Sequence, residues 1–128
     1  YDGKLIVIDN QSLGQLINIE GMNNIINSNY TEFIEGNFEG KAEILYKKYG
    51  YFDFVWFDCG GPNEYIRFIQ EFWEYCSSYI FFHFTYSNGK PNTNHKIIHE
   101  NIKGDIEIID IVEPHKKRQG SITMVKKK

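Results

Sequence analysis

The stretch YFDFVWFDCGGPNEYIRF, residues 51–68, decides the fold of this chain of 128 residues. It begins with a short apolar and aromatic run, Phe52 to Phe57, which predicts a buried strand. Asp58 and two glycines follow, and Pro62 suits the first turn of a helix. The apolar residues after it share one helical face and predict a helix that extends to Cys76: Tyr65, Phe68, Ile69, Phe72, Trp73 and Cys76. A strand that turns directly into an amphipathic helix is typical of an α/β fold.

The same alternation of strand and helix runs outward from this stretch in both directions. Short apolar runs predict strands at Lys4–Ile8, Thr31–Glu35, Tyr79–Phe84, Asp105–Val112 and Ser121–Val125. Helical spacing predicts helices at Ser12–Ile26, Ala42–Lys48 and Asn94–Ile102. The run Lys4–Ile8 is typical of a parallel strand buried on both faces.

The last two predicted strands are joined by too few residues for a helix, so they must pair antiparallel. We therefore predict one α/β domain over residues 1–128. It has a Rossmann-like, mostly parallel sheet, helices on both faces and a C-terminal antiparallel β-hairpin.

Composition narrows the class of protein. The chain is 41% hydrophobic and 16% aromatic, enough for a core, and its net charge of −3 argues against nucleic-acid or membrane-surface partners. Cys59 and Cys76 lack metal-type spacing and fit a reduced, intracellular setting. No apolar run approaches the ~20 residues that cross a bilayer, and no signal-peptide pattern opens the chain, so we expect a cytoplasmic protein.

Ligands of open parallel sheets bind beyond the carboxyl ends of the strands, so the residues at the strand tips are the candidates for a site. Asp9, next to Asn10, could accept hydrogen bonds from both hydroxyls of a ribose, or cap the following helix. Asn37 and Phe38 could offer an amide edge and an aromatic wall to a purine ring, or form an ordinary turn.

The later strand tips carry an acid and a histidine. Asp58 could hold a cationic group or a metal, orient a substrate, or cap the helix that begins near Pro62. His83 is a candidate general base, or else a core histidine with satisfied hydrogen bonds. His95 and His99 have the i, i+4 spacing of a zinc site but lack the glutamate of HExxH, so a solvated helix face is favoured for them.

Three stretches carry a resemblance to a known family. Phe52–Asp58 is similar to the family's fourth strand, residues 113–126 to its closing hairpin with a glycine before the last strand, and Glu35–Phe38 to its adenine-side turn. With this order of elements the chain resembles the class I S-adenosylmethionine-dependent methyltransferases, particularly small-molecule O-methyltransferases of the caffeoyl-CoA type. The likeness covers essentially all 128 residues, from the family's second strand to its last.

The resemblance implies S-adenosylmethionine as the cofactor. Asp9 would bind its ribose with Asn10 beside it, and Asn37 would replace the usual adenine-side Asp while Phe38 lines the ring. Asp58 would face the methionine part or the acceptor, and His83 would take the proton.

The chain departs from the family in two places. The family's first strand and glycine-rich loop are absent from these 128 residues. We expect either that they belong to an N-terminal part that precedes Tyr1 or that another segment takes their place in the sheet. Metal-dependent members carry Asp-Asn where this chain has His83-Phe84, which predicts chemistry without a metal.

The resulting prediction is methyl transfer to an oxygen or nitrogen of a small molecule, and a homodimer is compatible with it. The alternative is a catalytically inactive remnant or a partner-binding domain.

Overall fold

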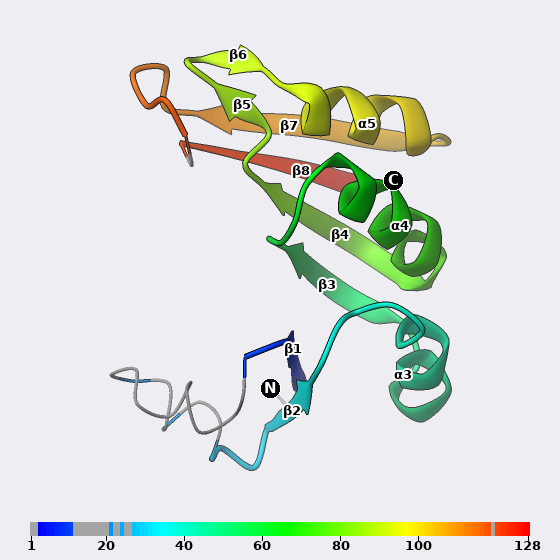
Figure 1. Ribbon diagram of the computed structural model, residues 1–128. Helices are drawn as coiled ribbons and strands as arrows, with labels where there is room; N and C mark the ends of the chain where they lie inside the picture. Colours follow the sequence, from blue (N-terminus) through cyan, green and yellow to red (C-terminus); the bar gives the residue numbers. More distant parts are fainter. Residues whose placement is uncertain (1–2, 12–20, 22–23, 25–26, 119) are drawn as a thin grey trace. The chain divides into compact units, whose positions relative to one another are not determined.

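The computed structural model describes residues 3–11, 21, 24, 27–118 and 120–128 and has a mixed α/β architecture (Figure 1). Contacts divide the chain into two compact units, residues 1–38 and residues 39–128. The helix predicted over residues 12–26 lies almost entirely outside the described residues. The prediction of one domain over the whole chain stays a prediction.

In the first unit, β1 (Leu5–Asp9) and β2 (Thr31–Glu35) pair in parallel, with Asp9 opposite Glu35. The amide of Gly36 donates a hydrogen bond of 2.8 Å to the carbonyl oxygen of Asp9, so the two strand tips meet at one edge. The sequence predicts a first strand buried on both faces, whereas none of the five residues of β1 is fully buried. Two paired strands cover each other along one edge only, so their faces depend on other elements for burial.

The second unit contains a four-stranded sheet with the order β3-β4-β8-β7. Its strands are β3 (Phe52–Phe57), β4 (Cys76–His83), β7 (Ile106–Val112) and β8 (Ser121–Lys127). β3 and β4 are parallel, while β8 runs antiparallel to β4 on one side and to β7 on the other. The predicted C-terminal antiparallel hairpin is thus confirmed, but the sheet mixes both kinds of pairing instead of being mostly parallel.

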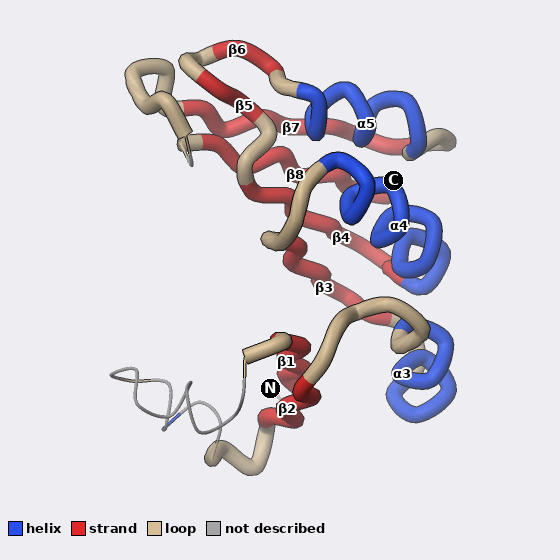
Figure 2. The backbone as a smooth tube through the Cα atoms, in the orientation of Figure 1, coloured by secondary structure: helices blue, strands red, loops and turns tan. Residues whose placement is uncertain are grey.

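The helices described in residues 39–128 are α3 (Ala42–Tyr49), α4 (Pro62–Phe72) and α5 (Thr93–Asn101). Figures 1 and 2 show α4 and α5 on the same face of the four-stranded sheet. α3 lies beside α4, since the Ala42 amide donates a hydrogen bond of 3.1 Å to the Glu71 carboxylate. Helices on both faces stay a prediction, because the helix expected at residues 12–26 is not described.

Aromatic packing forms the core between α4 and the sheet. The ring of Phe57 stacks on Phe68 with 4.1 Å between centroids and meets the edge of Tyr65 at 4.9 Å. Phe82, on the neighbouring strand, is fully buried beside Tyr65. The helical spacing read in the sequence is confirmed here, because Tyr65, Phe68, Ile69 and Phe72 are the buried residues of α4.

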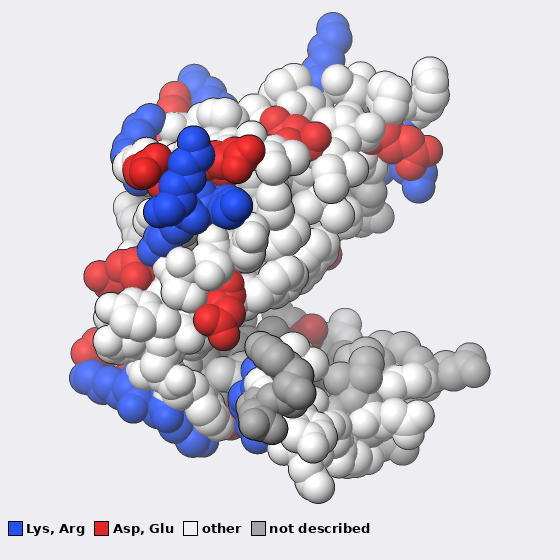
Figure 3. Space-filling view, turned by 180° about the vertical axis from the view of Figure 1, so that it is seen from behind, with Lys and Arg blue, Asp and Glu red and all other residues white. Residues whose placement is uncertain are grey.

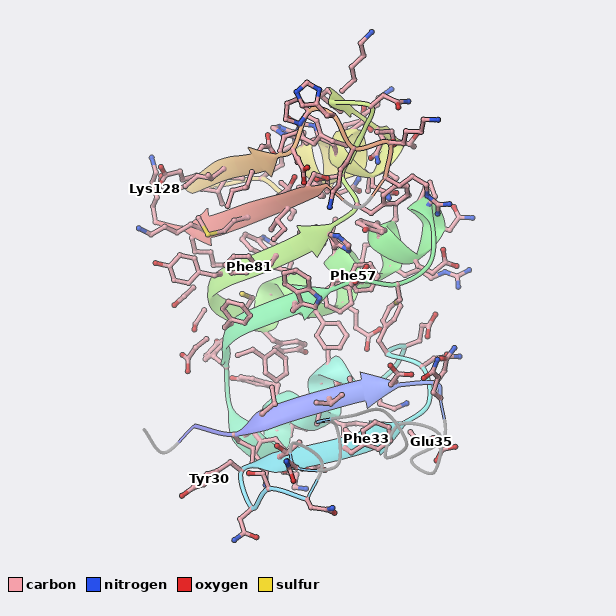
Figure 4. All side chains as sticks on the ribbon, turned by 90° about the vertical axis from the view of Figure 1, so that its left-hand side faces the viewer. Tyr30, Phe33, Glu35, Phe57, Phe81 and Lys128 are labelled. Atoms are coloured by element: carbon pink, nitrogen blue, oxygen red, sulfur yellow. The ribbon has the colours of Figure 1, made fainter. Side chains whose placement is uncertain are left out.

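The opposite face of the sheet is apolar and exposed, and Figure 4 looks onto it. Phe54 is 59% exposed and Ile111 is 63% exposed, and Trp56 and Ile109 are also exposed. The ring of Phe81 stacks on Phe54 at 4.5 Å, which places both side chains on this face.

The sequence predicts that the helix after Pro62 extends to Cys76. In the structure, Cys76 is instead the first residue of β4. α4 ends at Phe72, a 3₁₀ turn covers Trp73–Tyr75, and Cys76 then pairs with Phe52. Strand pairing decides the structure at this position, whereas the apolar spacing that extends the helix in the sequence is local information.

The connection after β4 contains a short hairpin that is not among the strands predicted from the sequence. β5 (Tyr86–Ser87) pairs antiparallel with β6 (Lys90–Pro91). Asn88 and Gly89, between them, have φ angles of 53° and 72°. An Asn-Gly pair with positive φ at both residues is the usual two-residue hairpin turn, so this signal was present in the sequence.

Both signs of charge are spread over the face of the molecule seen in Figure 3, where lysine and arginine side chains lie among acidic ones. Among the described residues, no helix has the length and hydropathy needed to cross a bilayer.

The burial of the two cysteines leads to a test of the fold. Cys76 is 1% exposed and burial raises the pKa of its thiol, whereas Cys59 is exposed. Because the thiolate is the reactive form, we expect a thiol reagent to modify Cys59 quickly and Cys76 only after denaturation. Mass spectrometry of alkylated native protein measures this, and equal labelling of both thiols would contradict the placement of Cys76 in β4.

Candidate active site at the ends of β3 and β4

Asp58 and His83 lie together where the parallel strands β3 and β4 end. The Oδ1 atom of Asp58 is 3.0 Å from Nδ1 of His83, and the two side chains are 49% and 20% exposed. A carboxylate at Nδ1 orients the imidazole and favours the tautomer whose Nε2 carries the lone pair. The two residues predicted as catalytic therefore form one close acid–histidine pair that solvent can reach.

The alternative role of Asp58, as the cap of α4, is wrong. The N-cap of α4 is Gly61, with no side-chain cap hydrogen bond, and the Gly61 amide donates to Oε2 of Glu64 at 2.8 Å. This hydrogen bond lowers the pKa of Glu64, as expected for a carboxylate that accepts from a backbone amide. The start of the helix is thus satisfied without Asp58.

The backbone around His83 is held from several sides. The hydroxyl of Tyr65 donates to the carbonyl oxygen of His83, and burial raises the pKa of Tyr65 so that this donor keeps its proton. Phe84 has a φ of 57°, a conformation that a bulky residue adopts only when its surroundings enforce it. The side-chain amides of Asn92 and Asn94 donate to its carbonyl oxygen at 3.0 and 3.1 Å. These bonds fix the turn that follows His83.

An open depression of about 430 Å³ lies next to this pair. His83 and Trp56 line it together with Ile111, Gly120 and Ile122. The ring of Trp56 is roughly parallel to that of His83, with 6.1 Å between centroids. The depression is large enough for a small organic molecule, and its wall is mainly apolar around one imidazole.

The other predicted site residues lie in the first unit. Oδ1 of Asp9 accepts a hydrogen bond of 2.8 Å from the amide of Gln11, which forms a local turn after β1. Asn10 and Asn37 are exposed, and Phe38 is buried. The parallel pairing of β1 with β2 brings these residues to the same edge of their two-stranded sheet. The meeting of Asp9 with Asp58 in one crevice stays a prediction, because the two belong to different units.

A second polar cluster joins α5 to β7 and is not predicted by the sequence. His95 and His99 lie one turn apart on α5, and Asp110 of β7 lies against them, with Oδ2 3.0 Å from Nε2 of His95. The prediction of a solvated helix face is wrong for His95, whose side chain is 14% exposed. In the sequence, the signal for this partner was an acid, Asp110, directly between Ile109 and Ile111 of a largely apolar strand.

Burial and charge act on the pKa values of this cluster. Burial, followed by the charge of His95, lowers the pKa of His99. For Asp110, burial works to raise the pKa, but hydrogen bonds from Thr123, His95 and Tyr86 outweigh it and lower the pKa. At neutral pH these directions favour a neutral imidazole at His99 and a carboxylate at Asp110.

The family of this chain is not established by comparison with known proteins. No protein-family model matches the sequence, and no curated protein is significantly similar to it.

Proposed function

We propose that this protein is an S-adenosylmethionine-dependent methyltransferase that acts on an oxygen or nitrogen of a small molecule. The observation that carries the proposal is the antiparallel strand β8, which lies between β4 and β7. A closing antiparallel hairpin of this kind is the arrangement of the family that the sequence resembles. The pair of Asp58 and His83 at the adjacent strand tips adds a polar site in the expected place.

The residues of the first unit would hold the nucleoside part of the cofactor. Asp9 would accept hydrogen bonds from the ribose hydroxyls, and the exposed Asn10 and Asn37 would offer amide groups next to it. Phe38 would contribute a buried apolar wall on the adenine side. The hydrogen bond from the Gly36 amide to the Asp9 carbonyl oxygen supports this assignment. It joins the end of β1, which carries the proposed ribose ligand, to the turn after β2, which carries the residues proposed for adenine.

The bound cofactor would supply a methyl group already activated by its sulfonium centre, so the protein has to align the acceptor and remove a proton. Asp58 would accept a hydrogen bond from Nδ1 of His83, and Nε2 of His83 would take the proton of the acceptor. The acceptor's oxygen or nitrogen would then bond to the methyl carbon as the bond from that carbon to sulfur breaks, with the neutral sulfide as the leaving group. The depression lined by Trp56 and His83 supports a small acceptor with an apolar body.

A partner-binding domain without catalysis is the second candidate. It is favoured by one observation, the exposed apolar sheet face with Phe54, Trp56, Ile109 and Ile111. Exposed apolar patches of this kind commonly mark sites of protein association.

Binding of S-adenosylhomocysteine by the whole protein separates the two candidates. We expect saturable heat in calorimetry and a raised midpoint of thermal unfolding, because a ligand that binds only the folded state stabilises it. Asp9→Asn should weaken this binding by roughly ten- to a hundredfold, the effect of losing a hydrogen bond to a charged group.

Asp53→Asn is the matched control for this experiment. Asp53 is an exposed acid near the start of β3, away from the strand tips, and its variant should bind like the unmodified protein. No binding by the unmodified protein, or equal losses in both variants, would contradict the proposed function and favour the partner-binding domain.

A further inference from the structure

We propose that His95, His99 and Asp110 bind a divalent transition-metal ion of the Zn²⁺ class. This site is separate from the strand tips where methyl transfer is proposed, and it does not depend on that function. It joins α5 to β7 within the unit of residues 39–128.

The donor atoms of the three side chains already converge. One ligand atom from each residue lies within 4.8 Å of the others. The Nε2 atoms of His95 and His99 are 3.3 Å apart, and Oδ2 of Asp110 is 3.0 Å from Nε2 of His95. Zinc bonds of about 2.0–2.1 Å in a tetrahedral site place donor atoms about 3.3 Å apart. The separation of the two histidine Nε2 atoms already matches this value.

Small movements would bring the three donor atoms to the separations of a tetrahedral zinc site. The distance between Asp110 and His95 has to open by a few tenths of an ångström for tetrahedral geometry. The ring of His99 has to move closer to Asp110. Its side chain is exposed on the last turn of α5 and can rotate to do so. Two histidines at i and i+4 on one helix are a common pair of zinc ligands.

The Nε2 atom of His95 lies close to more polar groups than one hydrogen bond can serve. Nε2 of His95 has three polar neighbours, namely Oδ2 of Asp110 at 3.0 Å, Nε2 of His99 at 3.3 Å and the Tyr86 hydroxyl at 3.5 Å. A ring nitrogen carries one proton or one lone pair, so it can serve one of them well. A cation between the three ligand residues would be bound by all their donor atoms at once.

Asp110 is oriented for this role by the residues behind it. The Thr123 hydroxyl donates to its Oδ1 at 2.6 Å, and the Tyr86 hydroxyl donates to its Oδ2 at 3.0 Å. Hydrogen bonds of this kind fix the orientation of metal-binding carboxylates in known sites. The Thr123 bond keeps Oδ1 engaged, so Oδ2 is the oxygen that faces the histidines.

The set of ligands selects the class of metal. Two imidazoles and one carboxylate suit Zn²⁺ and its neighbours in the transition series, whereas Mg²⁺ prefers oxygen ligands throughout. Three protein ligands leave a fourth tetrahedral position for water.

Titration of the chelator-treated, untagged protein with Zn²⁺ tests the proposal. We expect one Zn²⁺ per chain, a raised midpoint of thermal unfolding, and with Co²⁺ the visible absorption of tetrahedral coordination. Mg²⁺ at the same concentration should produce no shift. His99→Ala should weaken Zn²⁺ binding roughly tenfold or more, because loss of a direct ligand costs at least as much as loss of its supporting residue.

Two variants keep the result unambiguous. His99 is exposed, so its alanine variant is expected to fold, and circular dichroism verifies this. His115→Ala removes an exposed histidine outside the cluster and should leave binding unchanged. The proposal is overturned if the unmodified protein binds no Zn²⁺ at micromolar concentration, or if His99→Ala binds as well as His115→Ala does.

Discussion

Replacing Phe82 by alanine is expected to lower the free energy of unfolding by about 3–5 kcal/mol, the usual cost of removing a buried aromatic ring. Phe82 is fully buried near the end of β4, on the sheet face that α4 covers. Its ring lies 5.8 Å from that of Tyr65 and 6.2 Å from that of Phe57, so alanine would leave a cavity between the helix and two strands. Urea denaturation followed by circular dichroism measures the change.

Phe54→Ala is the matched control, since it deletes the same side chain from the opposite face. Phe54 is 59% exposed and has one stacked neighbour at 4.5 Å, Phe81. Its loss should lower the free energy of unfolding by about 0.5–1.5 kcal/mol, the contribution of one aromatic pair. Equal effects of the two substitutions would contradict the assignment of the helix-covered face.

Thr123→Val is expected to lower the free energy of unfolding by about 1–3 kcal/mol, although valine has nearly the same shape. Thr123 and Thr85 are both fully buried, and their hydroxyl oxygens are 2.7 Å apart. Beyond them, Oγ1 of Thr123 lies 2.6 Å from the Asp110 carboxylate, and Oγ1 of Thr85 lies 3.2 Å from Oγ of Ser121.

Only one ordering of protons satisfies this chain of hydroxyls. Oγ of Ser121 already accepts from the amides of Thr85 and Tyr86 at 3.0 and 2.9 Å, so its own proton goes to Thr85. Thr85 must then donate to Thr123, and Thr123 to Asp110, which only accepts. Valine at position 123 would leave the Thr85 proton buried without an acceptor.

The exposed Thr93→Val provides the control for this prediction, and it should change the free energy of unfolding by less than about 0.5 kcal/mol. Urea denaturation compares the two variants. A Thr123→Val protein as stable as the Thr93→Val protein would show that the buried hydroxyls do not form the ordered chain.

The strands and helices of residues 39–128 were largely predictable because their signals are local. The apolar run of β3, the turn at Pro62 and the helical spacing of Tyr65 and Phe68 all act within a few residues, and each is present in the structure. The position of Cys76 was not predictable in this way, because its pairing with Phe52 joins residues that are distant in sequence. The mixed character of the sheet likewise depends on where β8 inserts.

The same distinction applies to the sites. Asp58 and His83 were predictable as neighbours, since the tips of adjacent parallel strands meet at one edge. The contact of Asp110 with His95 depends on how α5 packs across β7, which no local pattern encodes.

The methyltransferase proposal is tested most directly by an NMR titration of the ¹⁵N-labelled whole protein with S-adenosylhomocysteine. The account predicts saturable shifts of the amides at the strand tips, namely Asp9, Asn37, Asp58 and His83, with little change at the opposite ends near Phe52 and Cys76. An unchanged spectrum, or shifts confined to those opposite ends, would contradict it.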